Sequence, residues 1–362
     1  MNNLPDQINQ LLESSPYSYN GSAKQELLLP LLIELVKFHY DNCKEYRNIL
    51  DALQTDISAI NTFEQLPFLP VELFKQLTLS SVPPGEISQT MSSSGTTSQL
   101  LSKIYLDKQT AFLQKRVLAK ISAEFIGRKR RPMVVIDVRS SISNRQSFSA
   151  RAAAILGFSS FSKSQFFALK DDMTLDIDGL REYLAAHESE SIFFFGFTYM
   201  IWEFFLRPLS ESNSRFNLGN ATLIHGGGWK KLTNTNVSSE QFRNEIFRVT
   251  GLRDVHDYYG MVEQTGSIFV ECSEHYLHAS NFSTIIIRDA FDFSALPFNQ
   301  IGLVEVISVV TLSYPGQVIL TEDLGRILGE DDCVCGMHGR YFEILGRIEN
   351  AEIRGCSDTF VV

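Results

Sequence analysis

Between residues 131 and 251 the sequence alternates short apolar runs with helix-like segments, and this alternation constrains the fold most strongly. Apolar runs rich in β-branched or aromatic residues predict buried strands at 131–138, 191–197 and 221–228. Helical patterns are predicted at 151–158, 175–187, 199–209 and 238–251. The last of these begins with a Ser-x-x-Gln capping box, Ser238 to Gln241, and ends at Gly251. This alternation is typical of a mostly parallel sheet covered by helices, and therefore of an α/β protein.

The segments on either side of this core have different patterns. Residues 24–53 carry apolar side chains at three- and four-residue steps, which predicts an amphipathic helical region that packs on a larger body. Strand-like stretches separated by turns fill the last third and predict a smaller, β-rich lobe. We therefore expect a helical N-terminal region at 1–80, an α/β core at 81–270, a β-rich subdomain at 271–345, and a hinge with a short tail at 346–362.

The composition disfavours several classes of partner. The formal net charge is −10, so neither a nucleic acid nor an anionic membrane is expected as the main partner. No uncharged apolar run reaches the roughly 18 residues of a membrane-spanning helix, and the N-terminus lacks the pattern of a secretory signal. The cysteine count of five is odd, and two of them form Cys333-Val-Cys335, which is typical of a reducing compartment. We expect a cytoplasmic protein.

A run of three glycines, Gly226, Gly227 and Gly228, follows His225 at the end of one predicted strand. In lipases and esterases a His-Gly-Gly-Gly loop supplies backbone N–H groups to an oxyanion. Those enzymes also need a Gly-x-Ser-x-Gly nucleophile motif, and this sequence contains none. A hydrolase is therefore disfavoured, and the glycines call for another explanation.

Other unusual short stretches also fall at expected strand ends, where ligands gather in such sheets. Residues 92–97 are small and hydroxylated around one glycine, which suits a phosphate-binding nest or a polar surface loop. Tyr259 and Gly260, with Glu263 after them, offer a ring face for a flat base and a carboxylate for a cation, or form a turn. Asp323 can accept hydrogen bonds from a ribose diol or belong to a solvated turn.

The order of these stretches resembles that of the AMP-forming adenylating superfamily, which is acyl-CoA synthetase-like, from about residue 60 to the end. Within it, five stretches most resemble the acyl-protein synthetases of bacterial luminescence. They are LPFLPVELFK, SSSGTTS, HGGGWKK, YGMVEQ and the Gly-Arg pair before EIRGC. This LuxE-like family comprises long-chain-fatty-acid–luciferin-component ligases, and phenylacetate–CoA ligases are a more distant likeness. The resemblance implies the N-terminal domain of an adenylate-forming enzyme, with layered α/β sheets and a small β-rich lobe. The C-terminal lobe is expected to be absent or minimal, since the sequence stops soon after Arg347.

The resemblance implies a site for ATP and Mg²⁺. The residues that would grip the ATP phosphates are Ser93, Ser94, Gly95, Thr96 and Thr97. Gly226, Gly227 and Gly228 would lie beside the adenine and acyl group, because residues without side chains let a flat group rest on the backbone. The remaining implied contacts are Tyr259 with adenine, Glu263 with Mg²⁺, Asp323 with ribose, and Arg347 with ribose or phosphate. Lys230 and Lys231 are candidates for the phosphates or belong to a solvated helix start.

The sequence departs from the superfamily pattern at two places. Ser98 stands where a glycine usually follows the second threonine of the phosphate loop. Val262 stands where a threonine usually precedes the metal-binding glutamate, and valine cannot donate a hydrogen bond to the α-phosphate. Gln264 or Thr265 would have to replace that contact.

Cys356 occupies the position of the cysteine on which acyl-protein synthetases carry the acyl group. Its thiolate, favoured by the neighbouring Arg354, would attack the acyl-adenylate and release AMP; the alternative is an inert surface cysteine. The implied function is ATP-dependent activation of a carboxylic acid, expected to be a fatty acid. Its acyl group would pass through the Cys356 thioester to a partner, a reductase or an acyltransferase. The alternatives are an acyl-CoA or carrier-protein ligase of the phenylacetate–CoA ligase type, and a non-catalytic nucleotide-binding relative.

Soft metal ligands cluster in two further stretches, at 272–278 and 333–338. The candidates are Cys272, His275, His278, Cys333, Cys335 and His338. Any four could bind Zn²⁺ tetrahedrally, and phenylacetate–CoA ligases resemble the chain here. The preferred set is Cys272, His278, Cys333 and Cys335. A closed set of four predicts a structural zinc; the alternative is packed thiols and surface histidines, because Cys-x-Cys is an uncommon zinc spacing.

Overall fold

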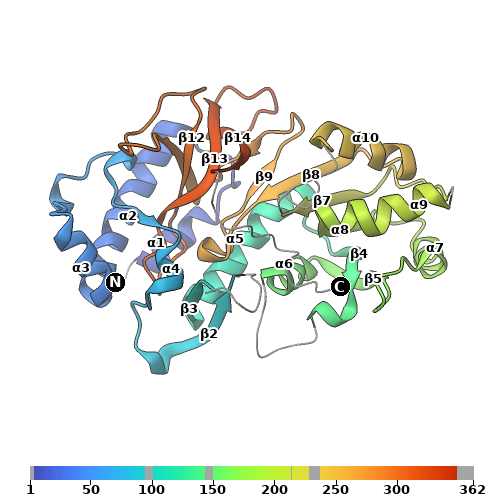
Figure 1. Cartoon of the computed structure of the whole chain (residues 1–362), viewed down its shortest axis with the longest axis horizontal. Coiled ribbons are helices and arrows are strands. Elements are labelled where there is room, and N and C mark those ends of the chain that lie inside the picture. Colours follow the sequence, from blue (N-terminus) through green and yellow to red (C-terminus); the bar gives the residue numbers. More distant parts are fainter. Residues whose placement is uncertain (1–3, 94–100, 143–149, 213, 228–236, 349–362) are drawn as a thin grey trace. The chain divides into compact units, whose positions relative to one another are not determined.

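The chain divides into two compact units that do not follow the order of the sequence (Figure 1). The computed structural model describes residues 4–93, 101–142, 150–212, 214–227 and 237–348. Of the described residues, the first unit comprises 4–93, 101–121 and 260–348, and the second comprises 122–142, 150–212, 214–227 and 237–259. The N-terminal helices and the C-terminal strands thus share one unit, while the alternating segment forms the other. The predicted α/β class is confirmed.

A parallel sheet forms the centre of the second unit. Its strands are β4 (Arg131–Val138), β5 (Ser162–Leu169), β6 (Phe193–Phe197), β7 (Thr222–Gly226) and β8 (Asp254–Tyr259). They pair in parallel in the order β5-β4-β6-β7-β8. The helices between them are α6 (Ala150–Ser159), α7 (Ile177–Ala186), α8 (Thr198–Ile201), a π-helical turn (Trp202–Leu206), α9 (Arg207–Glu211) and α10 (Ser239–Thr250). The predicted capping box at Ser238 and the glycine stop at Gly251, with φ of 70°, are both present.

Helices cover both faces of this sheet, which explains why its strands are apolar throughout. In β6, Phe195 stacks on Phe158 of α6 with ring centroids 4.5 Å apart. Phe194, the residue before it, packs against Phe205 with ring centroids 6.3 Å apart. Because successive strand side chains point to opposite faces, a strand buried on both sides needs no polar alternation. The run predicted at 191–197 is therefore a fully buried strand, and the phenylalanines Phe193, Phe194, Phe195 and Phe197 are core residues.

The first unit joins helices of the N-terminal region to strands of the last third. Its helices are α1 (Leu4–Leu11), α2 (Gly21–Asn42), α3 (Lys44–Ala52) and α4 (Leu73–Gln76), and α5 (Lys108–Ile126) begins in it. Its strands include β9 (Phe269–Glu271), β10 (Leu277–His278), β11 (Ser283–Arg288), β12 (Gly302–Ser308), β13 (Val318–Glu330) and β14 (Arg340–Arg347). These pair antiparallel in the order β11-β12-β13-β14-β10-β9. The short strand β1 (Leu69–Pro70) pairs in parallel with β13, and β2 (Ile87–Ser92) forms a hairpin with β3 (Lys103–Asp107).

Short 3₁₀ turns link several of these elements. They lie at Ile57–Ala59, Phe63–Gln65, Pro84–Glu86, Arg139–Ile142 and Val262–Gln264. The helical region predicted at 24–53 is present but divided at Cys43, whose extended backbone ends α2 and starts α3. Among the described residues, no helix combines the length and hydrophobicity that crossing a bilayer requires.

Polar contacts fasten the N-terminal helices to the C-terminal strands, and the blue helices lie beside the orange and red strands in Figure 1. Lys24 of α2 donates from Nζ to the carbonyl of Ala279 at 3.0 Å. His39 of α2 contacts the carbonyl of Thr311 through Nε2 at 3.0 Å. Burial lowers the pKa of His39 to about 3, so this imidazole is neutral in the folded protein. The N-terminal helices and the strands of the last third therefore share one core.

Candidate functional site

Asp323 and Arg347, both predicted from the sequence, face each other across two paired strands. Asp323 lies in β13 directly opposite Arg347 at the end of β14. Arg347 donates from Nε to Oδ1 of Asp323 at 2.7 Å, and its Nη1 is 3.9 Å from Oε2 of Glu322. The backbone N–H of Ile348 also donates to the carbonyl of Glu322 at 3.1 Å. The strand register thus holds an aspartate and an arginine in one place, with a second carboxylate beside them.

Glu263, the predicted metal-binding carboxylate, is buried in the same unit. Burial raises the pKa of its carboxyl, while the Ser102 hydroxyl and the positive charges of Arg347 and Lys75 act in the opposite direction. Its backbone is fixed as well, because the hydroxyl of Tyr314 donates to the Glu263 carbonyl at 2.8 Å. A buried carboxylate held this firmly is suited to binding a hard cation through oxygen.

Gly266 allows the segment that carries Glu263 to lie against α5. Its φ is 90°, a conformation that residues with a side chain rarely adopt. A Cβ atom at this position would lie 2.5 Å from the carbonyl oxygen of Gln114 in α5. No local sequence pattern identifies this glycine, because the contact is with a residue far away in the chain.

The base of the predicted phosphate loop is described, although most of the loop is not. Ser93 and Ser102 close it with two hydrogen bonds: Ser93 N–H donates to the Ser102 carbonyl at 3.1 Å, and Ser102 N–H donates to Ser93 Oγ at 3.0 Å. Thr265 contacts Met91 of the same hairpin, with 3.7 Å between Oγ1 and sulfur. The base of the loop is thus connected to the Glu263 segment, as a phosphate-and-metal site requires. The predicted Ser94, Gly95, Thr96 and Thr97 lie outside the described residues.

The glycine-rich strand end belongs to the second unit, and part of it has a structural explanation. Gly226 pairs with Tyr258 of β8, and a Cβ atom on Gly226 would overlap the Tyr258 ring. The space above this glycine is therefore filled by an aromatic side chain of the protein itself. Gly227 has a φ of 88°, which also favours glycine. Tyr259 ends β8, and Gly260 follows it as the start of the last segment of the first unit.

Several predicted residues cannot be located. Gly228, Lys230, Lys231 and Cys356 lie outside the described residues.

His225, directly before the glycines, is buried, and its Nδ1 is 2.9 Å from Oγ1 of Thr198. Burial lowers the pKa of His225 to about 3, so it is a neutral partner of Thr198 in the core.

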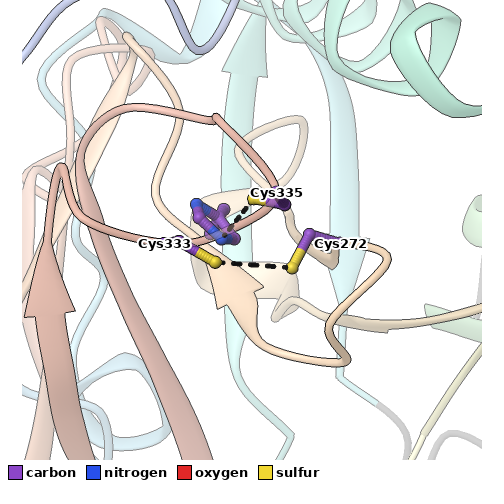
Figure 2. A group of neighbouring side chains, drawn as sticks. Cys272, Cys333 and Cys335 are labelled. Atoms are coloured by element: carbon purple, nitrogen blue, oxygen red, sulfur yellow. Dashed lines mark hydrogen bonds between the residues drawn. The ribbon is translucent and has the colours of Figure 1, made fainter.

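Four potential metal ligands converge from separate parts of the chain: Cys272, His278, Cys333 and Cys335. Figure 2 shows the three cysteines of this cluster. Cys272 follows β9, His278 lies in β10, and Cys333 and Cys335 lie in the turn between β13 and β14. One ligand atom from each falls within 4.8 Å of the others. The two sulfur atoms of Cys272 and Cys333 are 4.0 Å apart, and Cys335 Sγ is 3.5 Å from His278 Nε2. In a tetrahedral zinc site with Zn–S bonds of about 2.3 Å, sulfur ligands lie about 3.8 Å apart.

The surroundings of the cluster also fit a cation. Backbone N–H groups of Glu274 and Met337 donate to the sulfurs of Cys272 and Cys335 at 3.3 and 3.4 Å, an arrangement that supports thiolates. Burial raises the pKa of Cys335 to about 12 and raises that of Cys272, so these thiols stay neutral unless a positive charge joins them. His278 Nδ1 is buried and has no hydrogen-bond partner among the described residues.

The other two candidate ligands point elsewhere. His275 Nδ1 is 3.9 Å from a carboxylate oxygen of Glu271, and its side chain is 40% exposed. His338 Nδ1 is 3.5 Å from Asp331, with 47% of its side chain exposed. The preferred set of four is therefore the set that the fold brings together within the described residues.

Comparison with known proteins agrees with the resemblance seen in the sequence. The family model of acyl-protein synthetase, LuxE, matches residues 3–361. Long-chain-fatty-acid–luciferin-component ligases of Vibrio harveyi and Aliivibrio fischeri are each 22% identical to the chain, over 352 and 357 residues. The alignments cover 95% of this chain in both cases, and 89% and 90% of the relatives.

Solved structures resemble the chain in fold. An open conformation of 2-hydroxyisobutyryl-CoA ligase, in complex with 2-HIB-AMP and CoA, matches with a TM-score of 0.71 and 15% identity. That match covers 93% of this chain and 77% of the ligase. The same ligase in its thioesterification state matches with a TM-score of 0.69 and 16% identity, over 93% of this chain and 70% of the ligase. The expected adenylate-forming fold is confirmed.

Replacing Gly266 with alanine should disturb the segment that carries Glu263. The strained φ and the contact with Gln114 should lower the free energy of unfolding by about 2 kcal/mol or more. Urea unfolding measures this change. Gly85→Ala is the matched control, because a Cβ there meets nothing within 4 Å and should leave stability unchanged. Equal stabilities of the two variants would contradict the role assigned to Gly266.

Proposed function

The chain belongs to the acyl-protein synthetase (LuxE) family of ligases, and on this premise we propose that it activates a fatty acid with ATP and carries the acyl group on Cys356. The observation that supports this most directly is the Asp323–Arg347 pair, whose arginine charge also acts on the buried Glu263. A ribose diol, a phosphate and a cation each find a partner of the right chemistry there. The relatives named for long-chain fatty acids support that substrate class.

In the first step a carboxylate oxygen of the acid attacks the α-phosphorus of ATP. The bond between the α-phosphorus and the bridging oxygen to the β-phosphate breaks, and pyrophosphate leaves with that oxygen. The residues proposed to hold the phosphates are Ser93, Ser94, Gly95, Thr96, Thr97 and Lys230. Glu263 would hold Mg²⁺, which balances phosphate charge when bound.

The remaining proposed nucleotide contacts are with the ribose, the adenine ring and the acyl group. Asp323 orients the ribose through its hydroxyl groups, and Arg347 fixes the aspartate for that contact. Tyr259, with Gly260 beside it, would face the adenine ring. Gly227 and Gly228 would leave the backbone open to the base and the acyl group, since Gly226 is already covered by Tyr258.

In the second step the Cys356 thiolate attacks the acyl carbonyl carbon. A carbon–sulfur bond forms, the bond to the phosphate oxygen breaks, and AMP leaves. The thioester then supplies the acyl group to a partner enzyme of the reductase or acyltransferase class, where the carbonyl is reduced or transferred. Coenzyme A or a carrier-protein thiol is the alternative acceptor.

Incubation with Mg-ATP and a long-chain fatty acid should add one acyl group to the intact mass of the protein. Hydroxylamine should remove it, because it cleaves thioesters, and Cys356→Ala should not acquire it. Cys43→Ala is the matched control, since Cys43 is buried and burial raises the pKa of its thiol, so that variant should still be acylated. Acylation of Cys356→Ala would rule out Cys356 as the carrier, and AMP formation only with coenzyme A present would favour the alternative acceptor.

We further propose that Cys272, His278, Cys333 and Cys335 hold a structural Zn²⁺. The donor set, the spacing of the ligand atoms and the N–H donors to sulfur support this assignment. A set of four protein ligands leaves no open position for a reacting water, so the ion would stabilise the fold rather than take part in the reaction. It would fasten the β13–β14 turn to β9 and β10 of the same unit.

Protein purified from zinc-supplemented medium should contain about one zinc ion per chain, and Cys333→Ser should lose it with a clear drop in Tm. Metal content by mass spectrometry and thermal unfolding measure the two effects. His338→Ala is the matched control: it removes a neighbouring histidine that points away from the cluster and should keep its zinc. Metal-free protein with the Tm of the supplemented sample would contradict the assignment.

A further inference from the structure

The segment before α4 places Lys75 at the same end of β13 as Glu322 and Asp323. β13 has two edges, and β12 covers one of them from residue 318 to 325. On the other edge, β14 pairs with residues 323–330, and β1 pairs with Ile319 and Leu320. β1 therefore continues the edge on which β14 ends, and α4 begins within three residues of β1.

Hydrogen bonds fix both segments around this point. Val71 N–H donates to the carbonyl of Leu320 at 2.9 Å, directly before α4. Ile348 N–H donates to the carbonyl of Glu322, directly after β14. The end of β14, which carries Arg347, and the start of α4, which carries Lys75, therefore meet at Glu322 and Asp323.

The side chain of Lys75 is only 5% exposed, which is unusual for a lysine. Its ammonium is 3.5 Å from Oε1 of Glu72, which is half exposed. Its charge also reaches a deeper carboxylate. Burial raises the pKa of Glu322, and the positive charges of Arg347 and Lys75 oppose that rise.

We propose that Lys75 is a nucleotide-binding residue whose ammonium group contacts the α-phosphate of ATP and of the acyl-adenylate. This inference rests on the proposed function, in which Asp323 binds the ribose and Glu263 holds the metal ion at the phosphates. The α-phosphate is bonded to the ribose through O5′ and lies between the ribose and the β-phosphate. A buried cation at the same end of β13 as the Glu322-Asp323 pair is therefore within reach of that phosphate.

The contact would serve both binding and reaction. Negative charge grows on the α-phosphate oxygens as the carboxylate attacks, and a preorganised ammonium in a buried site stabilises that charge. Lys75 exchanges no bond with the substrate. It would supply a phosphate contact from the first unit itself, in place of the hydrogen bond that Val262 cannot make.

The test compares AMP with adenosine, which differ only in the phosphate. Calorimetric titration should show that Lys75→Met binds AMP about ten- to a hundredfold more weakly than the unaltered protein. Adenosine affinity should not change. Lys75→Gln, which keeps a hydrogen-bond donor without the charge, should also bind AMP more weakly. Lys75→Arg should have an intermediate affinity for AMP. Lys37→Met removes an exposed lysine of α2 and should bind both ligands normally.

Three results would overturn the inference. Equally weakened binding of AMP and adenosine would mean that Lys75 acts only through the fold around Asp323. A lowered Tm of the variants in thermal unfolding would show that directly. Unchanged AMP affinity in both Lys75→Met and Lys75→Gln would show that there is no contact. Failure of the unaltered protein to bind either ligand would instead contradict the proposed nucleotide function, and the inference with it.

Discussion

The hydrogen bond from Arg347 to Asp323 is the contact on which the account of the nucleotide site depends. It joins residues that pair across β13 and β14, so it exists only if the two strands have this register. A shift of one strand by one residue would turn its side chain to the opposite face of the sheet and separate the pair. Charge-assisted hydrogen bonds are among the stronger ones, so the pair also helps to fix the register that creates it.

The same two strands connect both candidate sites of the first unit. One end of the β13–β14 pair carries Asp323 and Arg347, and the turn at the other end carries Cys333 and Cys335. β10, which supplies His278, pairs with β14 beside that turn. A metal ion at the turn would therefore hold the far end of the hairpin whose near end is proposed to bind the nucleotide.

Features with a local signature were predictable from the sequence. The apolar runs at 131–138 and 191–197 are strands, and the Ser238 capping box begins α10, because strand burial and helix capping are determined by nearby residues. The fold class followed from their alternation and from the family resemblance. The choice of four ligands from six candidates also agrees with the cluster that the fold assembles.

Contacts between distant segments were not predictable in the same way. Position 226 requires a glycine because Tyr258 lies over it, and position 266 requires one because Gln114 approaches it. Neither partner is near its glycine in the sequence. Lys75 belongs to the LPFLPVELFK stretch, but its burial follows from the parallel pairing of β1 with β13, which the sequence does not indicate. Such pairings depend on the packing of the whole unit, which no local pattern encodes.

If this chain makes an acyl-adenylate, it catalyses ATP–pyrophosphate exchange. In this assay labelled pyrophosphate enters ATP only when the first step runs in reverse. We expect exchange that requires a fatty acid and Mg²⁺ and that persists in Cys356→Ala, because the thiol acts only in the second step. Absence of exchange with every carboxylic acid tried, in protein shown to be folded, would contradict the formation of an acyl-adenylate.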